Sequence, residues 1–241
     1  MNVLDAGTDQ SAPWSVTRDN WAEPPGLRWS FLHLDEVLAT APIAASAAPV
    51  TLEVAPIPVL DVITPRYDVT ARIVDHTSVE QLLAESHTDG FLVMHHGRIA
   101  AEWYAPAMAP STRHLLMSVT KTVVGVIACA LVEDGVLALD DRVEAIIPAL
   151  AGSGFAGATV RDVLDMRTGV RFNETYHDPD ADVYLMEHAC GWRSPREDVP
   201  GSLREFLAQL PRDEEHGGRF RYRSSETNVL SWICEVASGQ D

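Results

Sequence analysis

An apolar run near the middle of the chain predicts its most prominent helix. Residues 123–132 read Val-Val-Gly-Val-Ile-Ala-Cys-Ala-Leu-Val, which places apolar side chains on every face of a helix. A helix of this kind is typical of the interior of a domain. Gly135 follows at the position where a left-handed residue often closes a helix. We therefore expect a buried helix that begins near Ser118 and ends near Glu133.

Four further helices are predicted from their end signals and apolar stripes. Three of them open with a capping-box pattern, in which a serine or threonine and a polar residue three positions later satisfy each other's backbone groups. The pairs are Ser78 with Gln81, Thr159 with Asp162, and Ser202 with Glu205. We expect Gly169 to end the second of these helices. The fourth helix follows Ser224 and closes at Gly239.

Two short segments predict a β-hairpin. Residues 91–96 and 99–104 are typical of strands, with a turn at Gly97 and Arg98 between them. A two-stranded sheet is marginally stable by itself, so we expect the chain to carry only part of its sheet. These elements predict an α/β fold of the α+β type, in which an antiparallel sheet is flanked by helices and the C-terminal part of the sheet is missing.

The remaining segments indicate how the chain is organised. Residues 39–65 are rich in alanine and proline, and residues 171–200 carry many charges and three prolines, so we expect loops in both. Residues 1–75 are expected to form an N-terminal arm and a loop-like segment that pack on the main domain. Residues 76–241 are expected to form the N-terminal portion of that domain.

The net charge of the chain limits the kinds of molecule that it is expected to bind. The chain has 35 acidic and 18 basic residues and a net charge of -17, which disfavours nucleic acid and anionic membrane surfaces. A cationic or zwitterionic small molecule would be better tolerated than a polyanion. We find no apolar run long enough to span a bilayer, no signal peptide and no disulfide framework, and therefore expect a cytoplasmic protein. The oligomeric state stays open, a homodimer included.

One pair of residues carries the candidate chemistry. Ser118 and Lys121 are three positions apart, a spacing that places both on one face of a helix. A serine becomes an effective nucleophile when a base accepts its proton, and a lysine held by burial or neighbours in its neutral form can be that base. The start of a helix also favours developing negative charge. A solvated lysine beside a serine that caps the helix is the simpler alternative.

Several segments resemble one family of enzymes. The segment Ser118-Val119-Thr120-Lys121 resembles the S-x-x-K motif of the serine β-lactamase-like hydrolases, which include class C β-lactamases, penicillin-binding proteins and related esterases. The resemblance is closest to the 6-aminohexanoate-dimer (nylon-oligomer) hydrolases and their carboxylesterase relatives, and it extends from about Trp21 to the end of the chain. The segments that carry it include Trp21–Pro25, Arg28–Phe31, His114–Met117, Thr159–Gly169, Asn173–Tyr176, Gly191–Arg193, Phe220–Ser224 and Val229–Trp232.

The resemblance implies a catalytic mechanism. Ser118 would be the acylated nucleophile, and Lys121 and Tyr222 would together accept and return its proton. Ser224 occupies the position that helps to orient the substrate. The family usually has asparagine there, so the motif is Y-x-S rather than Y-x-N and departs from the pattern of penicillin recognition.

The nylon-oligomer subgroup adds two expected substrate contacts. A tyrosine in the loop before the Gly-Trp-Arg segment hydrogen-bonds the scissile amide, and Tyr176 matches it. An acidic residue further along contacts the amino end of the substrate, and Glu187 matches that position. The alternative for both is a surface loop of ordinary composition.

The expected function is hydrolysis of a small amide or ester through an acyl-enzyme on Ser118. The competing interpretation is a truncated member of the fold that binds or regulates without catalysing, because the family's later strand, with its K-T-G or H-x-G motif, does not occur before Asp241. No cofactor or metal is expected. Residues 178–182 resemble the opening of a calcium loop, but the required glycine and glutamate are replaced by Val183 and Ala189.

Overall fold

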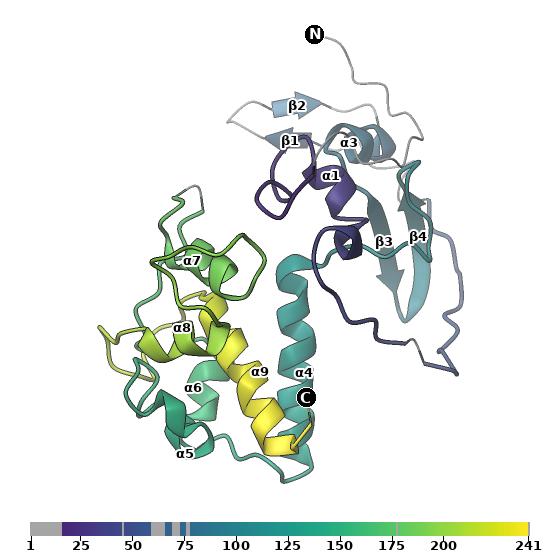
Figure 1. Ribbon diagram of the computed structural model, residues 1–241. Helices are drawn as coiled ribbons and strands as arrows, with labels where there is room; N and C mark the ends of the chain where they lie inside the picture. The colour runs from purple at the N-terminus through teal and green to yellow at the C-terminus, as the bar shows by residue number, and fades with distance from the viewer. Residues whose placement is uncertain are drawn as a thin grey trace. The chain divides into compact units, whose positions relative to one another are not determined.

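The structure is a computed structural model in which the described residues form two compact units (Figure 1). The first unit comprises Met1–Val16 and Ala22–His114, and the second comprises Thr17–Trp21 and Leu115–Asp241. The predicted division into an arm and a main domain stays a prediction. The residues that the structure describes are 16–44, 46–58, 66–68, 73–75, 78–176 and 178–240.

The first unit combines short helices with two antiparallel strand pairs. Its described elements are α1 (Leu27–Ser30), η1 (Leu34–Glu36), β1 (Arg66–Asp68), β2 (Ile73–Asp75), α3 (Val79–Glu85), β3 (Gly90–His95) and β4 (Arg98–Tyr104). Strand β1 pairs with β2, and β3 pairs with β4. Helix α3 begins after Ser78, as predicted, and the hydroxyl of Ser78 accepts a hydrogen bond from the N–H of Gln81. The side chain of Gln81 bonds Glu85 instead of completing the predicted capping box.

The hairpin of β3 and β4 confirms the predicted strand pair but shifts its turn. His95 faces Arg98 at the closed end of the hairpin. The two residues between them, His96 and Gly97, have positive φ values of 49° and 77°. Two successive residues in this region form the type I′ turn that suits a two-residue hairpin loop. The predicted turn at Gly97 and Arg98 is therefore one residue too late.

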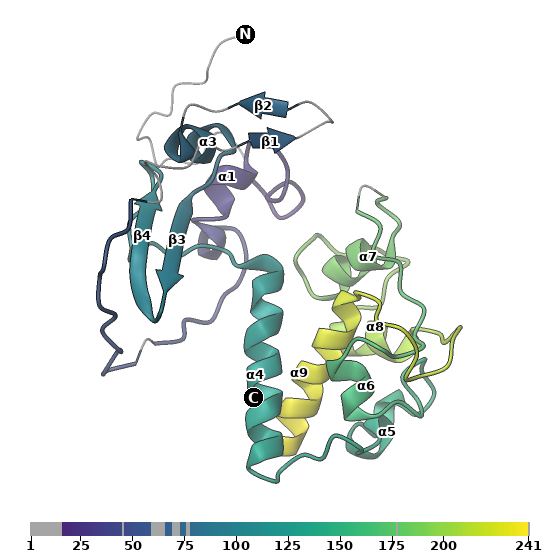
Figure 2. The same ribbon diagram turned by 180° about the vertical axis from the view of Figure 1, so that it is seen from behind.

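The second unit is helical and contains the main core. Its elements are η2 (Met117–Val119), α4 (Thr120–Glu133), α5 (Val143–Ile146), η3 (Pro148–Leu150), α6 (Val160–Leu164), α7 (Asp182–Ala189), α8 (Leu203–Gln209) and α9 (Ser224–Ser238). Helix α9 lies beside α4 (Figures 1 and 2) and also contacts α5, α6 and α7. The predicted stripe of α9 is buried at Val229 and Ile233, in one cluster with Phe155.

Local backbone chemistry explains where α6 begins and where α9 ends. Thr159 and Asp162 make both bonds of the predicted capping box at the start of α6. Helix α9 ends, as predicted, at Gly239 with a left-handed φ of 65°. Helix α6 instead ends at Leu164, so the expectation that it runs to Gly169 is wrong. The chain then turns through residues 165–168, which lead to the site described below.

Helix α4 has the predicted length but not the predicted burial. Among its side chains only Ala128 is buried, and Val123 and Val126 are 52% and 63% exposed in the described chain. One side of α4 packs against α9. The expectation of a fully buried helix is therefore wrong for the described residues, because an apolar sequence on all faces does not by itself supply a neighbour for each face.

Helix α7 lies within the stretch 171–200, for which we expected only loops. It is short, and its buried side chains Val183, Met186 and Ala189 recur every three residues. Flanking prolines and charges hide this pattern in the sequence. Apart from this helix, the mixture of helices with antiparallel strand pairs confirms the predicted α/β fold class.

Candidate active site

Ser118 lies where an irregular turn becomes helix α4. It is the middle residue of η2, and Met117 before it has a positive φ of 46°. This conformation is uncommon for residues with a side chain and is often found at functional turns. The turn leaves Ser118 exposed at the N-terminal end of α4, where the helix dipole favours negative charge.

Two side chains donate hydrogen bonds to the oxygen of Ser118. Lys121 Nζ lies 3.0 Å from Ser118 Oγ, and the phenolic oxygen of Tyr222 lies 2.6 Å from the same atom. The lysine also lies 5.1 Å from the centroid of the Tyr222 ring, a distance typical of a cation–π contact. The structure thus brings together the three residues for which the resemblance implies catalysis, although Tyr222 is 104 positions from Ser118.

Glu174 connects two of the remaining site residues and was not predicted from the sequence. Its carboxylate accepts hydrogen bonds from the N–H of Ser224 at 2.8 Å and from the hydroxyl of Ser224 at 2.6 Å. It also accepts a bond of 3.0 Å from the hydroxyl of Tyr176. Glu174 therefore joins the loop before α7 to the first residue of α9. A carboxylate in a loop has no spacing rule that could have assigned this position.

Tyr176 is surrounded by groups that keep its hydroxyl protonated. Burial raises the pKa of this phenol, and the negative charge of Glu174 and its hydrogen bond raise the pKa further. Tyr222 and Glu187 add smaller effects in the same direction. Tyr176 is therefore a neutral hydrogen-bonding group that lies close enough to Tyr222 and Glu187 to interact with them electrostatically.

Glu187 points its carboxylate toward an internal partner. Its Oε2 accepts a hydrogen bond of 2.6 Å from Arg193 Nε, and both side chains are mostly buried. Burial raises the pKa of Glu187, while the hydrogen bond and charge of Arg193 act in the opposite direction. A substrate ammonium at Glu187 would have to share the carboxylate with Arg193.

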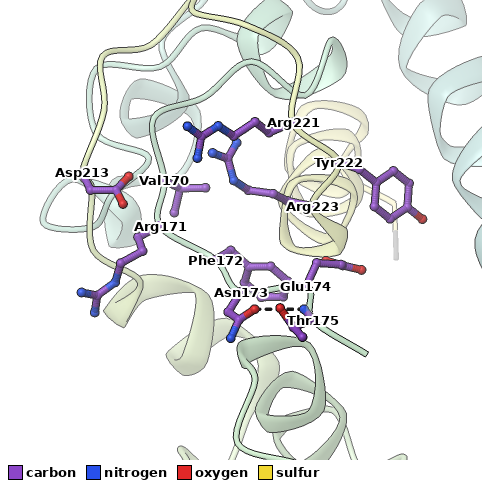
Figure 3. A pocket seen from close by; sticks show the side chains of 10 residues that line it. All are labelled: Val170, Arg171, Phe172, Asn173, Glu174, Thr175, Asp213, Arg221, Tyr222 and Arg223. Atoms are coloured by element: carbon purple, nitrogen blue, oxygen red, sulfur yellow. Dashed lines mark hydrogen bonds between the residues drawn. The ribbon is translucent and has the colours of Figure 1, made fainter. Parts of the chain in front are cut away.

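A cavity of about 350 Å³ lies beside the segment that carries Tyr222. It is lined by residues 170–175 and 221–223 together with Asp213. Figure 3 shows the ring of Tyr222 pointing away from the guanidinium groups of Arg221 and Arg223. Side chains alternate along an extended segment, so the tyrosine and the two arginines occupy opposite sides of it.

The described residues show neither a metal-binding cluster nor a membrane-spanning helix. In that part of the chain, no three side chains of His, Cys, Asp or Glu are grouped so that they could hold a metal ion. Its helices are also too short or too polar to cross a bilayer.

The family follows from a comparison with known protein families. The model of the β-lactamase family matches residues 77–241, which is more than half of the chain. The chain belongs to the β-lactamase family. This membership confirms the resemblance inferred from Ser118-Val119-Thr120-Lys121 and the other matching segments.

A curated relative gives the subgroup that this β-lactamase-family chain resembles. The 6-aminohexanoate-dimer hydrolase of Paenarthrobacter ureafaciens is 37% identical over 229 residues. The match covers 95% of this chain and 55% of the relative. The chain therefore spans about half the length of that curated relative.

Solved structures confirm the fold of this family member. A Bacillus anthracis protein, provisionally described as a 6-aminohexanoate-dimer hydrolase, matches with a TM-score of 0.81 at 24% identity, over 94% of this chain and 59% of its own. A Bacteroides dorei protein, provisionally described as a β-lactamase, matches with a TM-score of 0.50 at 21% identity, over 68% and 45%. The resemblance to the serine β-lactamase-like hydrolases implies a β-lactamase/transpeptidase-like fold, and the first of these matches confirms it.

Proposed function

We propose that this β-lactamase-family protein is a serine hydrolase that cleaves a small amide or ester through an acyl-enzyme on Ser118. The observation that carries the proposal is the convergence of Lys121 Nζ and the Tyr222 hydroxyl on Ser118 Oγ, at 3.0 and 2.6 Å. A nucleophile within hydrogen-bonding distance of a base is the arrangement that acyl transfer needs.

The proposed reaction has two halves. Ser118 Oγ attacks the substrate carbonyl carbon, and its proton passes to Lys121 or Tyr222, whichever of the two acts as the base. The bond from that carbon to the leaving nitrogen or oxygen breaks as the leaving atom receives the proton. Water then attacks the acyl-enzyme, gives its proton to the same base, and releases the acid as Ser118 regains a proton.

The proposed substrate is a 6-aminohexanoate-dimer-like amide or a short-chain ester. The curated relative supports the amide by its name and its 37% identity. Tyr176, Glu187 and Ser224 are the proposed substrate-binding residues. The net charge of -17 would favour the approach of a substrate with an ammonium group.

The first test is Ser118→Ala, assayed by hydrolysis of p-nitrophenyl acetate. We expect the rate to fall by about a thousandfold or more, as for the loss of other catalytic serines. Ser238→Ala is the matched control, because the hydroxyl of Ser238 bonds backbone groups near the end of α9, the carbonyl of Glu235 and the N–H of Gln240. Hydrolysis that persists unchanged in Ser118→Ala would contradict the proposal and favour a binding member of the family.

The second test separates amide from ester recognition at Tyr176. The variant Tyr176→Phe removes the hydroxyl and leaves the ring, and we expect a larger loss on 6-aminohexanoate dimer than on p-nitrophenyl acetate. The physical reason is that an amide N–H can donate to the phenolic oxygen, whereas an ester has no such group. Equal losses, or no loss on either substrate, would remove the amide-specific role.

A further inference from the structure

The segment that carries Tyr222 is tied to the loop after α6 on both sides of the tyrosine. Before it, the N–H of Arg221 donates to the carbonyl of Met166 at 2.9 Å. After it, Arg223 Nη1 donates to the carbonyl of Thr168 at 3.1 Å. The two ties lie two residues apart on each segment and bracket Tyr222.

A buried carboxylate completes the second tie. Glu226 is fully buried in the first turn of α9, and its Oε1 accepts hydrogen bonds from Arg223 Nη1 at 3.0 Å and from the hydroxyl of Thr168 at 2.7 Å. The side chain of Arg223 is only 4% exposed. One carboxylate therefore holds both the residue after Tyr222 and the loop that faces it.

Packing stability alone does not explain this buried pair. Burying two charges costs free energy because both lose their hydration, and this cost cancels most of their mutual attraction. An apolar pair of similar size therefore often gives equal stability. The second oxygen of Glu226, Oε2, is also buried without a hydrogen-bond partner in the described chain, which is unfavourable. What the pair does provide is a fixed position for the backbone next to Tyr222.

The loop after α6, which accepts both of these hydrogen bonds, is itself packed closely against residues 213 and 214. The carbonyl of Gly169 accepts hydrogen bonds from the N–H groups of Asp213 and Glu214 at 3.1 and 3.2 Å. A Cβ atom at Gly169 would lie 1.8 Å from the carbonyl oxygen of Glu214, so only glycine fits there. A displacement of Glu226 would therefore move the Tyr222 segment rather than be absorbed by the loop.

We propose that Glu226, Arg223 and Thr168 form a positioning network that holds the phenol of Tyr222 against Ser118. This inference rests on the proposed serine hydrolase function. Tyr222 is 40% exposed, so the place of its ring depends on the backbone that Arg223 and Glu226 fix. Displacing a catalytic group by about 1 Å can slow a reaction by roughly a hundredfold.

The network is tested with a double variant that removes both charges. Arg223→Met with Glu226→Leu keeps the side-chain volume without leaving one buried charge unpaired. The matched control is Arg204→Met with Glu235→Leu, which removes a partly exposed ion pair between α8 and α9. The single variant Glu226→Gln retains an acceptor for Arg223 and Thr168 and should rescue most of the activity.

The measurements are kcat and KM for p-nitrophenyl acetate, the labelling of Ser118 by a fluorophosphonate, and a thermal unfolding curve for each variant. We expect the 223/226 double variant to lose tenfold to a hundredfold in kcat and labelling rate with KM within a factor of three. We expect Glu226→Gln and the 204/235 variant to stay within a factor of three of the unaltered protein.

The outcomes separate the two proposals. If the unaltered protein is not labelled at Ser118, the proposed hydrolase function fails. If it is labelled and the folded 223/226 double variant is labelled equally fast, the network has no positioning role and the hydrolase proposal stands. If the double variant does not fold, the decision passes to Arg223→Lys. This variant keeps a cation but loses the guanidinium geometry, and an unchanged kcat in it overturns the inference.

Discussion

At Ser118, polar atoms from two distant parts of the chain meet within hydrogen-bonding distance of one oxygen. Lys121 lies in the first turn of α4, directly after the turn η2 that carries Ser118, so its place follows from the i, i+3 spacing. Tyr222 comes from a segment whose neighbourhood depends on how α9 packs beside α4. Its place could be predicted only through the resemblance to a family, because no local pattern relates residues so far apart.

Removing the phenolic hydroxyl tests the Tyr222 contact directly. In Tyr222→Phe we expect hydrolysis of p-nitrophenyl acetate to fall by about a hundredfold to ten-thousandfold, the usual contribution of a positioned acid or base. The ring and fold should be unaffected. Tyr104→Phe is the control, because the Tyr104 hydroxyl bonds Glu102 in the other unit. Equal rates for both variants would contradict a role for Tyr222 in proton transfer.

Glu174 and Glu226 show what the sequence leaves open at the residue scale. Glu174 bonds Ser224 and Tyr176, and Glu226 bonds Arg223 and Thr168. Each carboxylate joins two segments that are far apart in the sequence. Glu174 and Ser224 are separated by 50 residues, and Glu226 and Thr168 by 58. A tertiary contact of this length has no signature in residue spacing.

At the scale of elements, hydrogen bonds within a few residues were predictable and packing was not. The capping box of Thr159 with Asp162 and the left-handed glycine after α9 follow from local chemistry. The exposure of α4 and the existence of α7 depend on which neighbours the chain supplies. The apolar run of residues 123–132 predicted a helix correctly and its environment wrongly.

Two glycines give opposite predictions for the same substitution. In Gly169→Ala the new methyl group would meet the backbone of Glu214 at 1.8 Å, and we expect the free energy of unfolding to fall by roughly 3 kcal/mol or more. In Gly125→Ala, within α4, nothing lies within 4 Å of the new Cβ, and we expect a gain of about 0.5–1 kcal/mol. Chemical denaturation of both variants measures these values.

The result for Gly169→Ala also tests the anchoring of the loop after α6. A Gly169→Ala variant as stable as the unaltered protein would mean that the loop after α6 can move away from Glu214. The anchoring argument for the Tyr222 segment would then be wrong, whatever the effect of Gly125→Ala.

At the scale of the whole molecule, one buried group should shape the dependence of stability on pH. Burial raises the pKa of Glu226 from 4.5 to about 7, against the opposing effects of Thr168 and Arg223. Between these values the folded protein binds more protons than the unfolded chain, so its stability falls as pH rises. We expect a decrease of about 3 kcal/mol from this group between pH 4.5 and pH 7.

Glu226→Gln isolates that contribution. Because glutamine does not titrate, the slope of the free energy of unfolding between pH 4.5 and pH 7 should become less negative in this variant. Glu235→Gln, at a partly exposed ion pair on the same helix, should leave the slope unchanged. Parallel pH profiles for Glu226→Gln and the unaltered protein would contradict the shifted titration.

The fold of the whole chain was predicted from a few motifs in the right order. The β-lactamase family model over residues 77–241 and the structural match with a TM-score of 0.81 confirm that expectation. The two compact units have no simple signature in the sequence, because residues 17–21 join the second unit although the chain on both sides of them belongs to the first. Trp21 shows why: it is almost fully buried, and its indole N–H donates to the carbonyl of Trp192.

The most direct test of the account is the mass of the protein during turnover. The protein is mixed with p-nitrophenyl acetate, quenched in acid within milliseconds to seconds, and analysed as intact protein and as peptides. We predict an added acetyl group on the peptide that contains Ser118, and no such group in Ser118→Ala. An acetyl group on a different residue, or full hydrolysis by Ser118→Ala, would contradict the central claim.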